Sequence, residues 1–93
     1  MTCLVSQMAI EAYILFKVSS GMEREACKKI AEFDEVLVAD IIYGEYDLVA
    51  RVSLPDLQML EEFLAEKLRK VPSVLLTSTM LIAREYKGKT HRN

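Results

Sequence analysis

The order of apolar patterns along the chain is the feature that most constrains its fold. Runs that alternate or are rich in β-branched residues predict strands, and apolar residues at helical spacing predict helices. The expected elements are strands over residues 12–18, 36–43, 46–52 and 74–86, and helices over residues 22–33 and 55–70. Two strand–helix–strand units therefore follow each other. Because such crossovers are right-handed, we expect a ferredoxin-like α+β fold (βαββαβ): a four-stranded antiparallel sheet with both helices on one face.

Local signals mark where each helix begins and ends. Ser20 or Gly21 is the expected N-cap of the first helix. Pro55 suits the first turn of the second helix, and Ser53 and Asp56 have the spacing of a capping box. Pro72 is expected to end that helix, because proline disrupts a helix interior. The apolar stripe of this helix is expected to consist of Leu57, Leu60, Leu64 and Leu68.

Alternation along the strands assigns their side chains to the two faces of the sheet. The face toward the helices is expected to carry Ile14, Phe16, Val18, Leu48, Ala50, Val52, Leu76, Met80 and Ile82. The opposite face is expected to carry Tyr13, Leu15, Val49, Thr77, Thr79 and Leu81. Large exposed apolar patches are rare in monomers, so a second subunit is expected to cover this face and form a two-fold dimer. The alternative is a monomer whose open face is only semi-polar.

Length, charge and cysteine content exclude several classes of protein. Ninety-three residues correspond to one domain. The net charge is -2 and no basic run is present, which argues against direct nucleic-acid binding. Residues 1–10 lack a basic start and a long apolar core, so neither a signal peptide nor a membrane span is expected. Cys3 and Cys27 are the two cysteines, and we expect free thiols in a reducing cytoplasm.

The candidate site lies around a predicted tight hairpin at Gly44. Glycine there supplies the positive φ of a turn, and it also lets a ligand approach the backbone. Asp47 is expected either to accept hydrogen bonds from hairpin amides or to pair with the ammonium group of a ligand. Tyr46 packs at a sheet edge or reaches a ligand with its hydroxyl group. The hydroxyl groups of Thr77 and Thr79 are expected on the open face, although β-branching alone explains threonine in a strand.

No enzyme chemistry is indicated by the residue pattern. The single histidine, His91, lies near the end of the sequence, and no nucleophile–base pair is evident. The three glycines are scattered, which excludes a phosphate-binding glycine loop, and no metal-ligand cluster or cofactor motif is present. A dimeric α/β-barrel enzyme without a cofactor shares this strand order. It would need a polar group between sheet and helices, where the pattern is apolar.

Several features together resemble a known family. They are the Gly21 turn before a charged helix, the sequence Gly44-Glu45-Tyr46-Asp47, Pro72 before the last strand, and Thr77-Ser78-Thr79 within it. In this order and spacing they resemble the effector-binding domain of the Lrp/AsnC (feast/famine) transcription regulators. The similarity covers about residues 12–87, which leaves residues 1–11 as an N-terminal extension and residues 88–93 as a flexible tail. The chain departs from the family at Tyr43, where a small hydroxylated residue is usual, and at Ser73, where glycine is frequent.

The resemblance implies a function. It implies dimers that assemble into rings, commonly octamers, with an amino acid bound between dimers near the hairpin. The implied ligand-binding residues are Gly44, Tyr46, Asp47, Thr77 and Thr79. Eleven residues before the domain are too few for a helix-turn-helix, so a stand-alone effector domain that acts through full-length Lrp/AsnC regulators or metabolic partners is expected. The alternative functions are a scaffold without a ligand and the small dimeric enzyme.

Overall fold

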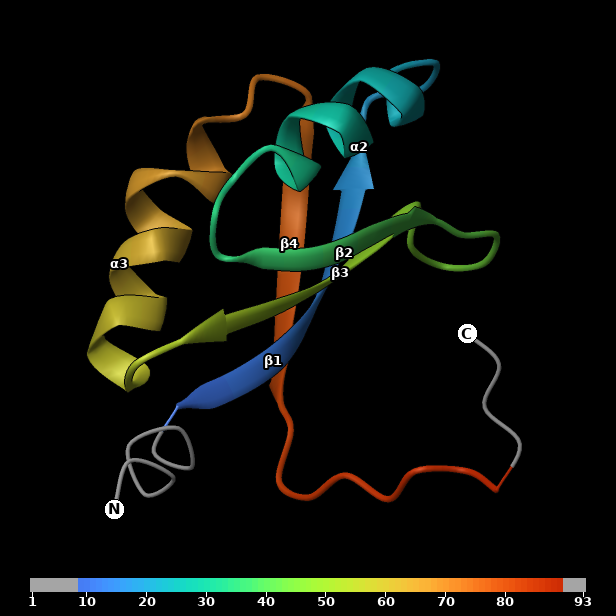
Figure 1. Cartoon of the computed structure of the whole chain (residues 1–93). Coiled ribbons are helices and arrows are strands. Elements are labelled where there is room, and N and C mark those ends of the chain that lie inside the picture. The colour runs from blue at the N-terminus through green and yellow to red at the C-terminus, as the bar shows by residue number, and fades with distance from the viewer. Residues whose placement is uncertain (1–8, 90–93) are drawn as a thin grey trace.

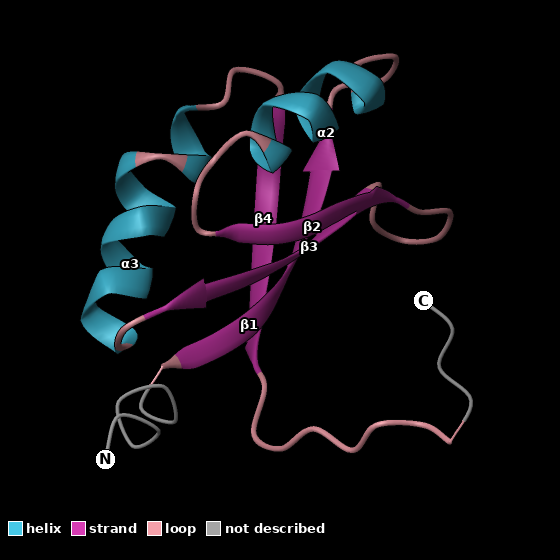
Figure 2. Ribbon diagram, viewed as in Figure 1, coloured by secondary structure: helices cyan, strands magenta, loops and turns pink. Residues whose placement is uncertain are grey.

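The computed structural model describes residues 9–89, which form one antiparallel sheet with two helices (Figures 1 and 2). The strands are β1 (Ile10–Val18), β2 (Val36–Ile41), β3 (Leu48–Leu54) and β4 (Val74–Leu81). The helices are α2 (Glu23–Ala31) and α3 (Leu57–Glu66), and a 3-10 turn, η1 (Leu68–Lys70), follows α3. The strand order is β2-β3-β1-β4. This is the expected ferredoxin-like arrangement. The expectations for Cys3, His91 and residues 1–8 of the extension lie outside the described range.

One apolar core lies between the sheet and the two helices. Alternate residues of the two central strands are buried, and they pack with Ala26 and Ile30 from α2 and with Leu60 and Phe63 from α3. The buried strand residues include Ile14, Phe16, Val18, Leu48, Ala50 and Val52. Both helices therefore cover the same face, and the face predicted for β1 and β3 is confirmed. The Phe33 and Phe63 rings meet edge to face with their centroids 5.7 Å apart, which joins the end of α2 to α3.

The connection between β2 and β3 is wider than a tight hairpin, so that prediction is wrong. β2 ends at Ile41 and β3 begins at Leu48, which leaves a six-residue loop between them. The Ile42 amide donates to the Asp47 carbonyl over 2.9 Å and closes the base of this loop. The Asp47 amide donates to Phe16 on β1, at 2.8 Å, and not to β2. The last regular pair between β2 and β3 on this side is Ile41 with Leu48.

Both predicted helix starts are also corrected. The residue before α2 is Met22, and no side chain caps this helix. Asp56 is the N-cap of α3, and its side chain accepts a hydrogen bond from the Met59 amide over 2.9 Å. Pro55 therefore precedes the helix, and Ser53 belongs to β3. In the apolar stripe, Phe63 is buried, whereas Leu57 is 51% exposed.

The facing of β4 differs from the prediction. Thr77 pairs with Phe16 and Thr79 pairs with Ile14, so both threonines share the helix-covered face with these buried residues. Residues 81 and 12 pair as well, which places Leu81 on that face. Leu76 and Met80 pair with Lys17 and Tyr13 and lie on the open face. The reason is that β4 does not alternate in sequence, and a register shift beside Val18 sets which residues face the helices.

β4 is shorter than expected and ends at Leu81 rather than at residue 86. The Ile82 amide still donates to the Glu11 carbonyl over 2.9 Å, which extends the pairing with β1 by one step. Residues 83–89 then leave the sheet as an exposed extended segment, drawn in orange to red in Figure 1.

Candidate functional site

Asp47 connects the loop of residues 42–47 to the end of β1. Its carboxylate oxygen Oδ2 accepts a hydrogen bond from the Val18 amide over 2.9 Å, and its own amide donates to the Phe16 carbonyl. The side chain thus has a structural task, although its donor lies on β1 and not in the hairpin. Among the described residues its second oxygen, Oδ1, accepts no hydrogen bond, so one face of the carboxylate is available to a ligand.

The other two loop candidates differ in their surroundings. Gly44 has a φ of +152°, a conformation that side chains disfavour, and an added Cβ there would meet no atom within 4 Å. Its backbone is therefore open to approach. Tyr46 is half-buried, and Lys17 Nζ lies 5.9 Å from the centroid of its ring. Tyr43, which precedes the glycine, is fully exposed.

A hollow of about 650 Å³ separates this loop from the first turn of α2. Asp47, Tyr43 and the end of β2 line one side of it. Gly21, Glu23, Arg24 and Glu25 line the other side. The wall thus holds three carboxylates and one guanidinium group, which are groups that pair with the ammonium and carboxylate ends of a zwitterion. The contribution of α2 was not expected from the sequence, because a charged first turn is ordinary for a solvated helix.

The two threonines lie apart from this hollow. Thr77 lines a different one, of about 380 Å³, together with Arg69 and the first residues of β4. β1 and β3 separate β4 from β2, so Thr77 and Thr79 cannot share the hollow at residues 42–47 within one chain. Of the five predicted residues, Asp47 alone lines the hollow beside α2. Gly44 and Tyr46 belong to the same loop without lining it, and Thr77 lines another hollow.

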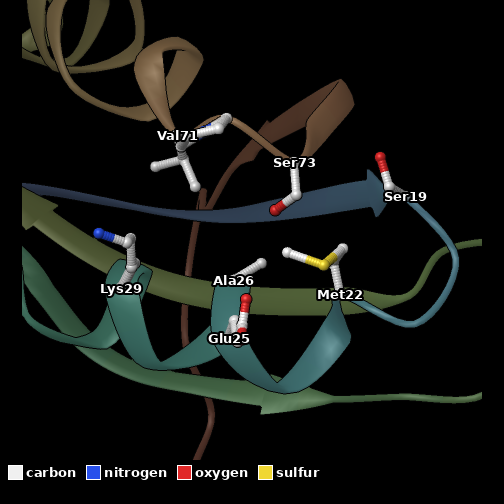
Figure 3. A pocket seen from close by; sticks show the side chains of 8 residues that line it. Ser19, Met22, Glu25, Ala26, Lys29, Val71 and Ser73 are labelled. Atoms are coloured by element: carbon white, nitrogen blue, oxygen red, sulfur yellow. The ribbon is translucent and has the colours of Figure 1, made fainter.

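A third hollow, of about 300 Å³, lies between α2 and the segment that leads into β4 (Figure 3). Val71 and Ser73 stand on one side of it, and Met22, Ala26 and Lys29 stand on the α2 side. The Ser19 amide donates to the Ser73 carbonyl over 2.9 Å and fixes this segment against the end of β1. Glu25 lines this hollow as well as the one at Asp47, so the two sites share a wall.

The open face of the sheet has an apolar part and an ionic part. Leu76 and Met80 are about half exposed, at 51% and 48%, and Tyr13 and Val38 lie on the same face. Near Tyr13, the Arg51 guanidinium contacts Glu11 at 2.6 Å and Glu85 at 3.4 Å. The hydrogen bond to Glu11 raises the pKa of Arg51, and the nearby negative charges add to it. The guanidinium also lies over the Tyr13 ring, 5.5 Å from its centroid.

Other chemistry is sparse in the described part of the chain. Burial raises the pKa of the Cys27 thiol, and the negative charge of Asp40 adds to this rise, so the thiolate form is disfavoured. Within residues 9–89 no group of three or more potential metal ligands gathers. No helix in that range has the length and apolar character needed to cross a membrane.

A family description matches most of the chain. The Lrp/AsnC ligand binding domain aligns with residues 11–91. The chain belongs to the Lrp/AsnC family. An uncharacterised HTH-type transcriptional regulator of Pyrococcus furiosus is 37% identical over 73 residues, which are 78% of this chain and 49% of that protein. This Lrp/AsnC domain thus spans about half the length of the curated relatives that it matches.

Two solved structures show the same architecture. A hypothetical protein from Pyrococcus horikoshii is 39% identical, with a TM-score of 0.76, and the match covers 88% of this chain and 99% of that one. A transcriptional regulator from Neisseria meningitidis, solved as a complex with L-Met, has a TM-score of 0.81 and covers 97% of this chain and 60% of its own. Its identity is 18%, so that likeness concerns the fold alone.

Proposed function

We propose that this Lrp/AsnC domain is an amino-acid-binding regulatory module. It forms dimers through the open face of its sheet, and the dimers assemble into rings such as octamers. An amino acid binds between dimers near the loop of residues 42–47. The bound amino acid favours one assembly over another and so modulates transcription or amino-acid metabolism through full-length Lrp/AsnC regulators. Family membership and the transcriptional regulators among the relatives support this proposal.

The observation that carries the proposal is the hollow beside Asp47. It has the size of a small-molecule site and is lined by charged groups of both signs. Asp47 Oδ1 has no hydrogen-bond donor among the described residues, so it is free to accept one from an ammonium group. Arg24 stands on the opposite wall and is suited to the carboxylate of the same ligand. The L-Met complex of the regulator from Neisseria meningitidis agrees with a ligand of this class.

The mechanism is linkage between binding and assembly. A ligand that contacts two dimers binds only when both are in place, so its binding free energy stabilises the larger assembly. A module of this kind needs no chemical step. Regulation then depends on which partner chains the assembly includes.

A thermal-shift panel of the purified protein against the twenty amino acids tests the proposal. A ligand at a hundredfold excess over its Kd adds about 2.7 kcal/mol to the stability of the native state. We expect a shift with a small number of amino acids and its loss in Asp47→Asn. The amide keeps an oxygen for the Val18 amide but removes the negative charge. Asp40→Asn, an exposed carboxylate on β2, is the matched control and should retain the shift.

A flat panel at millimolar concentrations, with assembly unchanged by amino acids, would favour a scaffold without a ligand. The bond between Asp47 and the Val18 amide fits such a scaffold, because it explains the aspartate without any ligand. The dimeric α/β-barrel enzyme is disfavoured, because the described core between sheet and helices consists of apolar side chains.

A further inference from the structure

The hollow between α2 and residues 71–73 has no part in the proposed function. Its volume is about 300 Å³, at the lower end of the range for small-molecule sites in proteins. Most of its lining consists of the apolar side chains of Met22, Ala26, Val71 and Pro72. In Figure 3, Met22 and Ala26 on α2 face Val71 across this space. An apolar group of a few carbon atoms would fit there and lose its contact with water.

Backbone hydrogen bonds hold the walls of this hollow in place. The Ser19 amide donates to the Ser73 carbonyl over 2.9 Å, and the Val74 amide donates to the Val71 carbonyl over 3.1 Å. The second bond closes a tight turn. On the opposite wall, Ala26 is 2% exposed and belongs to the apolar core. The hollow is therefore formed before a ligand arrives, which limits the ordering that binding requires.

Ser73 places a polar group in this apolar lining. The residue is 8% exposed, and its side chain points toward α2 in Figure 3. Its carbonyl is paired, but no described residue forms a hydrogen bond with its hydroxyl group. A buried hydroxyl group without a partner is unfavourable, and native structures contain few of them. A polar group of a ligand in the hollow would satisfy it.

Two charges of opposite sign lie at the rim of the hollow. Glu25 and Lys29 are four residues apart on α2, so they lie on the same side of the helix. Both are exposed, and neither takes part in a salt bridge within residues 9–89. Glu25 is thus available to an ammonium group and Lys29 to a carboxylate. A ligand with both groups and a short apolar part would contact the rim and the interior together.

We infer that this hollow is a second small-molecule site, which binds a free amino acid with an aliphatic side chain, such as leucine. The aliphatic side chain fills the apolar interior. The Ser73 hydroxyl group and Lys29 bind the carboxylate, and Glu25 binds the ammonium group. All of these groups come from one chain, so binding needs no second subunit. The site is separate from the hollow beside Asp47 and does not depend on the proposed function.

Titration of the purified protein with L-leucine, followed by NMR of isotope-labelled methionine methyl groups, tests this inference. Met22 lines the hollow, so its methyl resonance should shift and reach saturation. Met59, on α3, lies outside the hollow and is the internal reference. Met22→Leu assigns the resonance. Isocaproate lacks the ammonium group of leucine and isoamylamine lacks its carboxylate, so each should bind at least about threefold more weakly.

Substitutions on α2 and in the loop separate this hollow from the one beside Asp47. Lys29→Met removes the charge that binds the carboxylate and should weaken leucine binding at least about threefold. Lys28→Met is the matched control, because Lys28 is also exposed in the last turn of α2 but does not line the hollow. Asp47→Asn should leave the Met22 response unchanged. Glu25 is kept, since it lines both hollows.

Ser73→Ala distinguishes a binding role from a structural one. The hydroxyl group has no partner in the free protein, so its removal should leave the unfolding temperature unchanged or raise it. Leucine should still bind at least about threefold more weakly, because the donor to its carboxylate is lost. A lower unfolding temperature without leucine would show that the hydroxyl group stabilises the fold, which contradicts its role in binding.

The outcomes distinguish this inference from the proposed function. A Met22 resonance that does not move at millimolar leucine, or that isocaproate moves equally well, overturns the second site. A Met22 response that disappears in Asp47→Asn would originate in the other hollow, which also overturns the inference and leaves the proposed function intact. A saturable Met22 response that requires Lys29 supports the inference, even if no amino acid gives a thermal shift that depends on Asp47.

Discussion

The Asp47 carboxylate binds the Val18 amide through Oδ2, and Oδ1 is left for a ligand. Val18 is buried at the end of β1. A buried amide that loses its acceptor costs more than a hydrogen bond normally contributes. Asp47 is therefore expected to matter for stability whether or not a ligand binds, and the effect of a substitution on folding has to be separated from its effect on binding.

Asp47→Ala should lower the free energy of unfolding by about 1–3 kcal/mol, because the Val18 amide is left without a partner. Asp47→Asn should lower it by less, since the amide oxygen can replace Oδ2. Urea denaturation of the two variants in the absence of amino acids measures the difference. Equal losses in both would show that the negative charge, and not the hydrogen bond, stabilises the end of β1.

Glu35 and Lys67 form an ion pair between the segment that precedes β2 and the end of α3. Lys67 Nζ lies 2.8 Å from Glu35 Oε2 and 5.8 Å from the centroids of both Phe33 and Phe63. Burial alone would raise the pKa of Glu35. The hydrogen bond from Lys67, a backbone hydrogen bond and the charge of Lys67 together hold the pKa below its usual value. The pair therefore stabilises the fold only while Glu35 is ionised.

The lowered pKa of Glu35 determines how the stability of the fold depends on pH. With a folded-state pKa below the unfolded value of about 4.3, the contribution of Glu35 is fully present above that value. It is lost as the pH falls through the lower, folded-state pKa. Lys67→Met should reduce stability at pH 7 by up to about 1 kcal/mol, because the pair is partly exposed, and should flatten the decline in acid. Urea denaturation between pH 7 and pH 3 measures both effects, with Lys70→Met as the control.

Among the elements, helix α3 is capped by Asp56, whereas the sequence pattern predicted a capping box that begins at Ser53. Asp56 and not Ser53 is the N-cap, because Ser53 is still part of β3 and its amide donates to the Glu35 carbonyl at 2.9 Å. The end of β3 thus determines where α3 begins. A capping side chain satisfies one of the free amides of the first helical turn.

Asp56→Ala should destabilise the protein by about 1 kcal/mol, the usual effect of losing an N-cap. Ser53→Ala should change stability by no more than about 0.5 kcal/mol, as is typical of substitutions away from such features. Thermal unfolding of both variants distinguishes the two assignments. A larger effect for Ser53 would restore the capping box predicted from the sequence.

At the level of the whole molecule, the facing of β4 decides which residues a partner can contact. Leu76 and Met80 are on the open face, and Thr77 and Thr79 share the helix-covered face with Phe16 and Ile14. A dimer through the open face should therefore bury the leucine and the methionine. Burying one such side chain contributes about 1.5–3 kcal/mol.

Leu76→Glu and Met80→Glu should each weaken the dimer at least about tenfold, since each tenfold change corresponds to about 1.4 kcal/mol. Leu57→Glu is the control, because Leu57 is 51% exposed on α3, away from the sheet face. Sedimentation equilibrium of the three variants measures the dissociation constants. If all three remain dimeric with unchanged affinity, the open face is not the dimer interface.

Much of the fold followed from patterns that are local in the chain. The element order and the helix-covered face of β1 and β3 were predictable. The wide loop was not, because its form depends on the bond between the Asp47 amide and Phe16, which are distant in sequence. The contribution of Glu23, Arg24 and Glu25 to the lining of the hollow was not predictable either, since only folding brings α2 next to the loop.

The sequence by itself therefore determined the ferredoxin-like architecture, because apolar periodicity acts over a few residues and selects strand or helix directly. Tertiary structure alone decided the facing of β4 and the composition of each hollow. Both the odd-numbered and the even-numbered residues of β4 include apolar and hydroxylated side chains. The sequence of β4 is therefore compatible with either set turned toward the helices. Its register against β1, with the shift beside Val18, turns Thr77 and Thr79 toward the helices. A shift of one residue moves every side chain to the other face, and only the pairing partner can specify that choice.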